Sequence, residues 1–237
     1  MRLHWEDLQQ LQPIAVRNLP ETGAITGVDI DSRRIGENML FIAREGEQAD
    51  GHNYVASALN QGAGAAIVEQ RWFATAAPSD DWALVVVEDS DQALRDLAKI
   101  CRNTYDGPVL GITGSNGKTT AKEMISRVLA QEYSVLSTPG NYNNLWGLPL
   151  SVLQAEDHHD FWVLEHGMNR PGEIAELCEI SRPTAGLITS IAEVHSVNFD
   201  SVDAIAETKS AIYRALPENG IAFQNLDDPH IRDMQPA

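Results

Sequence analysis

The residues best suited to chemistry lie together at positions 111–120, in the run GITGSNGKTT. Glycine lets backbone N–H groups turn toward phosphate oxygens, Lys118 can reach the outer phosphates, and the Thr119 hydroxyl can hold Mg²⁺. The usual phosphate-loop spacing would place a glycine at Ile112, so this run is a variant of that motif. The phosphate contacts are assigned to Gly114, Ser115, Asn116, Gly117, Lys118, Thr119 and Thr120. The motif predicts nucleotide binding and specifies no reaction. A glycine-rich turn without a ligand is the alternative.

Two other side chains are placed where they could reach this loop. Glu165 ends the apolar run FWVLE, and His195 follows a second apolar run in TSIAEVH. Ligands of parallel α/β sheets gather at the carboxyl ends of the strands, so both side chains could converge on the loop as Mg²⁺ ligands. For each residue, an ordinary polar surface position is the alternative.

Lys209 is unusual because its position continues an apolar helical stripe. The chain has only four lysines, at positions 99, 118, 122 and 209. The stripe consists of Val202, Ile205, Ala206, Ile212, Tyr213 and Leu216. A lysine that faces a core must extend its ammonium to solvent, find an anionic partner, or lose its charge. The pattern alone leaves these possibilities open.

The elements that must position these residues follow from hydrophobic periodicity. In the first part of the chain we predict strands at 26–30, 39–43, 64–69 and 83–89, with helices at 54–63 and 91–103. The run TYDGP at 104–108 breaks the periodicity and marks a domain boundary.

A second alternation of strands and helices begins after this boundary. We predict strands at 108–113, 134–137, 161–165, 185–190 and 220–225, and helices at 118–131, 172–180 and 202–216. The first of these helices has one apolar face, made of Ala121, Met124, Ile125, Val128 and Leu129. Strands that alternate with helices predict an α/β fold whose sheet is mostly parallel and covered on both faces.

Composition excludes several classes of function. The 237 residues carry 34 Asp and Glu against 17 Lys and Arg, a net charge of −17. No broad basic surface for nucleic acid or for an anionic membrane is expected. The first ten residues do not read as a signal peptide, and no apolar run approaches the roughly 20 residues of a membrane-spanning helix. We therefore expect a cytoplasmic protein without membrane insertion, and a monomer.

Taken together, five ordered motifs resemble those of the Mur ligases. They are TGSNGKTTAKEM, GNYNNLWGLPL, LEHGMNRPGEI, the spacing from His195 to Lys209, and LPENGIAFQNLDDP. The resemblance covers nearly the whole chain and is strongest to the branch of the family that adds D-alanyl-D-alanine to UDP-N-acetylmuramoyl-tripeptide.

The resemblance implies a small UDP-sugar-binding α/β domain at 1–104, followed at 105–237 by the first part of a P-loop-type ATP-binding domain. It also implies ATP and Mg²⁺ as cofactors and amide synthesis through an acyl phosphate. Because the family has a longer central sheet and a carboxyl-terminal domain, we expect this chain alone to be truncated and unable to complete the ligation. The alternatives are the ligase that adds the third amino acid, a folate polyglutamate ligase, and a non-catalytic nucleotide-binding derivative. About 110 residues precede the phosphate loop, which disfavours the folate enzyme.

The family's functional residues can be placed on matching positions. The resemblance implies that Lys118 and Thr119 bind the ATP phosphates and the first Mg²⁺, that Glu165 is a Mg²⁺ ligand, and that His195 binds the second Mg²⁺. Lys209 matches a lysine that several Mur ligases carbamylate. The implied substrate contacts are Asn141, Asn143 and Asn144 in the cleft for the growing peptide. The implied contacts near the uridine diphosphate are Asp31, Ser32 and Arg33.

Overall fold

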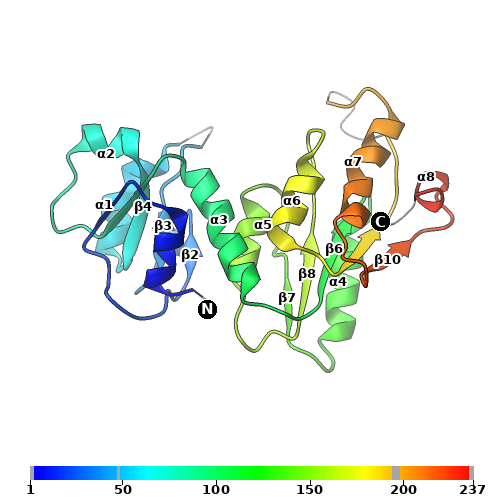
Figure 1. The fold of residues 1–237 in the computed structure, drawn as a ribbon, viewed down its shortest axis with the longest axis horizontal. Helices are drawn as coiled ribbons and strands as arrows, with labels where there is room; N and C mark the ends of the chain where they lie inside the picture. The colour runs from blue at the N-terminus through cyan, green and yellow to red at the C-terminus, as the bar shows by residue number, and fades with distance from the viewer. Residues whose placement is uncertain (1–2, 47–48, 194–197, 235–237) are drawn as a thin grey trace. The chain divides into compact units, whose positions relative to one another are not determined.

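The computed structural model describes residues 3–46, 49–193 and 198–234. The chain divides into two compact units (Figure 1). The first contains the residues up to Thr104 together with Leu153–Asp157, and the second contains Tyr105–Val152 and the residues from His158 onward.

The first unit is built on a five-stranded sheet with the order β1-β5-β4-β3-β2. Its strands are β1 (Ala15–Arg17), β2 (Val28–Asp29), β3 (Leu40–Ile42), β4 (Ala65–Glu69) and β5 (Leu84–Val87). Strands β2 to β5 are parallel, and β1 joins the edge of β5 in the antiparallel direction. The short helices and turns are η1 (Trp5–Leu11), η2 (Ser32–Arg34), η3 (Gly51–Tyr54), α1 (Val55–Asn60), α2 (Gln70–Ala76) and α3 (Ser90–Asn103).

Both faces of this sheet are covered. Side chains of a strand alternate between the faces, so Phe41, Ala66 and Leu84 share one of them. There they form a buried cluster with Val55 and Ala58 of α1. Helix α3 packs against β4 and η1 with most of its apolar residues buried. The sheet is therefore the middle layer of the unit, and its central strands β3, β4 and β5 are buried along their whole length.

The second unit holds a fully parallel sheet with the order β10-β9-β6-β8-β7. Its strands are β6 (Val109–Thr113), β7 (Val135–Ser137), β8 (Phe161–Glu165), β9 (Ala185–Ile188) and β10 (Ile221–Gln224). The helices are α4 (Lys118–Leu129), α5 (Gly147–Val152), α6 (Glu173–Ser181), α7 (Val202–Arg214) and α8 (Pro229–Arg232). The mostly parallel α/β fold predicted from the alternation of elements is confirmed.

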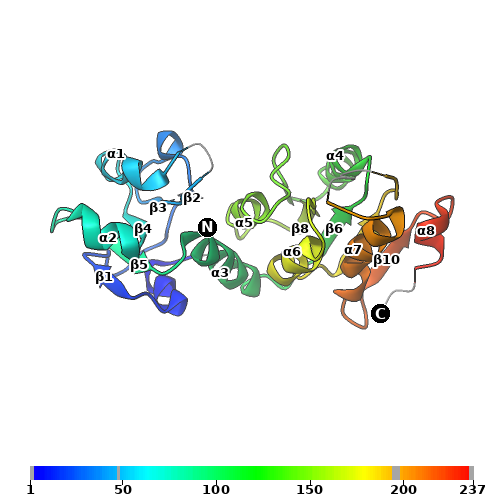
Figure 2. The same cartoon turned by 90° about the horizontal axis from the view of Figure 1, so that it is seen from above.

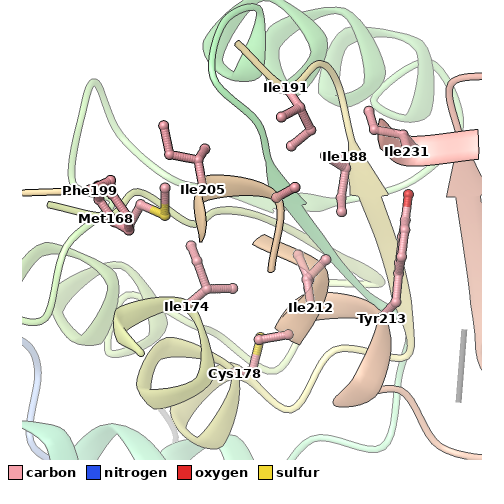
Figure 3. Packing of buried hydrophobic residues seen from close by; sticks show 12 residues of the cluster. Met168, Ile174, Cys178, Ile188, Ile191, Phe199, Ile205, Ile212, Tyr213 and Ile231 are labelled. Carbon is pink, nitrogen blue, oxygen red and sulfur yellow. The ribbon is translucent and has the colours of Figure 1, made fainter. Parts of the chain in front are cut away.

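Helices cover both faces of the second sheet. Figure 2 shows α4 on one side of β6 and β8, with α6 and α7 packed side by side on the other. The buried cluster on the α6 and α7 side is drawn in Figure 3, where Ile174, Cys178 and Ile212 lie between the two helices and the sheet. Because β6 lies between β8 and β9, the end of β6 is the centre of the sheet edge where ligands gather.

Several elements differ from those predicted. The pattern gave no signal for β1, α2 or α8, and α5 lies in what we expected to be a loop. All six residues of α5 are buried, including Pro149, so packing rather than sequence periodicity defines this helix.

Helix α4 is rotated relative to our expectation. Met124 and Val128, which were expected on its apolar face, are 64% and 73% exposed, whereas Lys122 is completely buried. The phosphate loop fixes the residue at which the helix begins. On the buried side of the helix, the Lys122 ammonium donates to the carbonyls of Thr138 and Gly140. The buried side of the helix therefore runs through Lys122, while Ala121, Ile125 and Leu129 of the predicted apolar face are part-buried. Within the described parts of the chain, no helix combines the length and apolar character that crossing a membrane requires.

Candidate active site

The phosphate loop connects β6 to α4, as its sequence predicts. Gly114 has a φ of +146°, and a Cβ at this position would collide with the Thr189 hydroxyl. Only glycine fits at such a position, because other residues would be strained and would have no space for a side chain. The backbone at Gly114 therefore lies directly against the end of β9.

The loop is held from behind by residues 189–192, which follow β9. The Ser115 hydroxyl donates to the Ala192 carbonyl and accepts from the Ala192 N–H, each at 2.9 Å. The Ser115 N–H also donates to the Ser190 carbonyl at 2.7 Å. In turn, Asp228 accepts the Ile191 N–H at 2.7 Å. The loop is thus held by protein contacts on the side of residues 189–192.

Two lysines meet at one backbone oxygen of this loop. The Gly114 carbonyl accepts from Lys118 Nζ at 2.9 Å and from Lys209 Nζ at 3.1 Å. Burial lowers the pKa of Lys118, and the nearby negative charge of Glu165 opposes this shift. Burial, followed by the positive charge of Lys118, lowers the pKa of Lys209 to about 7. Lys209 is only 2% exposed, so its ammonium does not extend to solvent. The sequence had left that possibility open.

Glu165 lies at the end of β8, opposite the first turn of α4. Its carboxylate accepts from the Thr119 hydroxyl at 2.9 Å and from the Asn143 side-chain amide at 2.8 Å. Glu165 is 1% exposed. The structure therefore brings together three residues that the sequence analysis had proposed separately. A carboxylate and a hydroxyl oxygen at this spacing form a donor set suited to Mg²⁺.

Asn143 packs against Gly167. The Gly167 N–H donates to the Asn143 carbonyl at 2.7 Å, and a Cβ on Gly167 would lie 2.6 Å from Asn143 Oδ1. The other two predicted asparagines do not reach Glu165. Asn144 Oδ1 accepts the N–H groups of Trp146 and Gly147 at the start of α5, and Asn141 is exposed. His195 lies outside the described residues, so its predicted metal role is untested.

The predicted uridine diphosphate residues Asp31, Ser32 and Arg33 line a cavity of about 770 Å³ in the first unit. Arg44 and Tyr54 also line it. The side-chain hydrogen bond from Arg33 is the main cause that lowers the pKa of Asp31, to about 2. Arg44 is held by Asp91, with Nε 2.7 Å from Oδ1. The cavity thus combines two guanidinium groups with an aromatic ring, which suits an anionic ligand with a planar base.

Several residues that support the site were not predicted from the sequence. Asp228 was not proposed, nor was Asn225, whose side-chain amide donates to the Thr189 carbonyl at 3.0 Å. Arg44 was not proposed either, although its position soon after β3 could have drawn attention to it. Lys122 was counted among the four lysines but given no role. Its spacing of four residues from Lys118 on one helix is the signal that could have found it.

Comparisons with known proteins identify the family of the chain. A family model described as "Mur ligase middle domain" matches residues 112–237, and one described as "Mur ligase family, catalytic domain" matches residues 24–101. The UDP-N-acetylmuramoyl-tripeptide--D-alanyl-D-alanine ligase of Bacillus subtilis is 38% identical over 213 residues, covering 90% of this chain and 46% of that protein.

Solved structures give the same result. A crystal structure of MurF from Acinetobacter baumannii is 33% identical, has a TM-score of 0.85, and is matched over 98% of this chain and 50% of that one. MurF ligase from Thermotoga maritima in complex with ADP is 36% identical with a TM-score of 0.75, over 88% of this chain and 47% of that one. The chain spans about half the length of the relatives it matches. These matches, together with the phosphate loop and the two-unit α/β fold, show that the chain belongs to the Mur ligase family.

Proposed function

We propose that the polypeptide carrying this chain joins D-alanyl-D-alanine to UDP-N-acetylmuramoyl-tripeptide at the expense of ATP. The proposal rests on one observation above the others: Glu165 is held between Thr119 of the phosphate-loop helix and Asn143. The names of relatives 38% and 36% identical to the chain support the choice of substrates. Since the chain spans about half of those relatives, the proposal concerns a polypeptide of their full length. We place it in the cytoplasm, as a monomer.

The nucleotide would bind at residues 114–120. Lys118 and Lys209 share the Gly114 carbonyl, and a polyphosphate would offer Lys118 a stronger, anionic acceptor. The ADP complex named for the Thermotoga relative supports a nucleotide at this loop. We assign ATP because a γ-phosphoryl group is needed to activate a carboxylate.

Mg²⁺ fits the oxygen donors present. We propose that Thr119 and Glu165 hold one ion and that His195 contributes to a second. When bound, Mg²⁺ would neutralise charge on the phosphates and on the transferring phosphoryl group. The chain's own contribution is to hold the Glu165 carboxylate in one orientation through its two hydrogen bonds. It also keeps Lys118 and Lys209 beside the loop.

The reaction we propose has two steps. An oxygen of the tripeptide's terminal carboxylate bonds to the γ-phosphorus of ATP as ADP leaves, which gives an acyl phosphate. The amine of D-alanyl-D-alanine then attacks the acyl carbon, loses a proton, and displaces phosphate. Lys118 stabilises the negative charge that spreads over the transferring group. The pKa of Lys209 near 7 leaves part of the amine neutral, and this is the form that could be carbamylated.

We assign a different ligand to each of the two units. Residues 1–104 would bind the UDP-sugar, with the uridine diphosphate in the cavity near Asp31, Ser32 and Arg33. Residues 105–237 would form the first part of the ATP-binding domain. Asn141, Asn143 and Asn144 would lie on the path of the growing peptide, with Asn143 touching the Glu165 carboxylate.

Replacing Lys118 tests the proposal. In the polypeptide at its natural length, Lys118→Ala should abolish phosphate release that depends on both UDP-N-acetylmuramoyl-tripeptide and D-alanyl-D-alanine. The circular dichroism spectrum should stay unchanged. Lys99→Ala is the matched control, because Lys99 lies in α3 of the first unit and is part-exposed. Near-normal turnover in Lys118→Ala would contradict the proposed site. The absence of dipeptide-dependent phosphate release in the unmodified polypeptide would contradict the proposed function.

A further inference from the structure

Lys122 is a completely buried lysine that the proposed mechanism does not use. It lies on α4, one turn beyond Lys118, and its side chain is 0% exposed. Taking an ammonium out of water is costly unless good partners replace the water, so an apolar residue would be the ordinary occupant of this position. A lysine here calls for a specific set of partners.

Those partners are backbone carbonyls of the segment that follows β7. Lys122 Nζ donates to the Thr138 carbonyl at 2.7 Å and to the Gly140 carbonyl at 3.3 Å. Its third neighbour is the half-exposed carboxylate of Glu123, 3.1 Å away. An ammonium has three donors, so this arrangement can occupy all of them. The lysine therefore ties α4 to the chain immediately before Asn141.

The same segment is fixed to Glu165. The Thr138 hydroxyl accepts the Glu165 N–H at 2.9 Å, and the Thr138 N–H donates to the Val163 carbonyl at 3.2 Å. Thr138 is 1% exposed. One residue is thus held by β8 on one side and by Lys122 on the other.

These contacts close a ring around the Glu165 carboxylate. Thr119 and Lys122 are three residues apart and lie on the same side of α4. Thr119 donates to one carboxylate oxygen of Glu165, while Lys122 holds the segment that leads to Asn143. Asn143 then donates to the other carboxylate oxygen at 2.8 Å. The distance between the phosphate-loop helix and Asn143 therefore depends on Lys122.

We propose that Lys122 is a positioning residue, whose ammonium anchors residues 138–143 to the phosphate-loop helix and so keeps Asn143 against Glu165. The effect of Lys122 on catalysis rests on the proposed function, because Lys122 would orient residues of the same site. Methionine would fill the volume of the side chain but would supply no donor. Arginine would bring a larger planar group into a completely buried position.

Amide hydrogen exchange on the 237-residue chain tests the anchor without any activity. In Lys122→Met, peptides covering residues 139–146 should exchange about tenfold to a hundredfold faster than in the unmodified chain, because a hydrogen bond to a charged group is lost. Peptides from α6, α7 and β9 should exchange at unchanged rates. Lys99→Met is the control and should change neither group.

Three results would overturn the inference. One is unchanged exchange at 139–146. Another is an equal acceleration throughout the second unit, which would make Lys122 a general stability residue. If Lys122→Met does not fold, Lys122→Gln, which keeps a shorter donor, provides the same comparison. The third result is failure of both variants to fold, since the lysine would then be required for the unit as a whole.

The catalytic consequence is measured in the polypeptide at its natural length. Lys122→Met should lower kcat about tenfold to a hundredfold, as is typical for residues that orient metal ligands, and should leave the KM for ATP within about threefold. The Mg²⁺ concentration for half-maximal activity should rise. A loss confined to the KM for ATP would contradict a role at Asn143 and Glu165. An inactive unmodified polypeptide would contradict the proposed function, while the exchange experiment would still decide the anchor.

Discussion

Lys209 provides a quantitative test of the electrostatics beside the phosphate loop. In the folded chain its pKa falls from the ordinary 10.5 to about 7, mainly through burial and secondarily through the charge of Lys118. Between these two values the unfolded chain holds a proton that the folded chain has released. The stability of the folded state therefore increases with pH in this window. The penalty from Lys209 is complete below pH 7. It disappears as pH rises toward 10.5.

The size of the effect follows from the shift. Each pH unit inside the window changes the free energy of unfolding by up to about 1.4 kcal/mol, so raising the pH from about 7 to about 9 should add about 2 kcal/mol through this residue. Lys209→Met removes the titration while keeping a side chain of similar length. The gain in stability over this pH range should therefore be about 2 kcal/mol smaller in Lys209→Met than in the unmodified chain.

Two measurements check this prediction. Urea unfolding followed by circular dichroism at the two pH values gives the difference between the variants, with Lys99→Met as the control for a part-exposed lysine. Carbon-13 labelling of lysine side chains gives the titration directly by NMR, because the chain has only four lysines and Lys209→Met identifies the signal. Parallel pH dependences of stability in both proteins, or a Lys209 signal that titrates with the other lysines, would refute the reasoning.

Three further predictions concern the second unit. Gly167→Ala should destabilise the chain by about 1 to 3 kcal/mol in urea unfolding, because its Cβ would lie 2.6 Å from Asn143 Oδ1. Gly36→Ala, whose Cβ would meet nothing nearer than 3.8 Å, should be close to neutral. Burial lowers the pKa of His166 from 6.5 to about 4, so the unfolded chain gains a proton first as pH falls through this range. The free energy of unfolding should drop by up to about 3 kcal/mol, and His166→Gln should lessen that drop. Burial raises the pKa of Cys178 to about 12, so Ellman's reagent should label it only after denaturant is added. Rapid labelling of the folded chain would contradict this.

The parts of the site that could be predicted are those with short, local signals. The phosphate loop is one continuous run between a strand and a helix, and Glu165 ends a five-residue apolar strand. Because the strands are parallel, their carboxyl ends lie at one edge of the sheet, and this alone predicts that the phosphate loop and Glu165 lie there. For this reason the proximity of Thr119 to Glu165 follows from the predicted fold.

The parts that could not be predicted depend on tertiary contacts. The apolar residues of α4 suggested a buried face, yet Met124 and Val128 are exposed and Lys122 is buried. Periodicity gives the relative angles of side chains around a helix, but the rotation of the helix as a whole is set by its neighbours. Here these neighbours are the strands β6, β7 and β8 and, for Lys122, the Thr138 and Gly140 carbonyls, which belong to a segment without regular structure. The same holds for helix α5. The Asn144 side chain that caps it is close in sequence, whereas the complete burial of the helix depends on distant parts of the chain.

The central place of β6 in its sheet affects how the chain is made on the ribosome. Thr113, at the end of β6, bonds to residues 53 and 76 positions later, in the segments after β8 and β9. At typical rates of synthesis, the later of these partners emerges roughly 4 to 15 seconds after β6. Both edges of β6 are open until β8 emerges, and the edge that pairs with β9 stays open for the whole interval, which is the kind of segment that pairs with other chains. The nascent phosphate loop therefore depends on delayed partners, and slower translation after β6 would lengthen its exposure to aggregation.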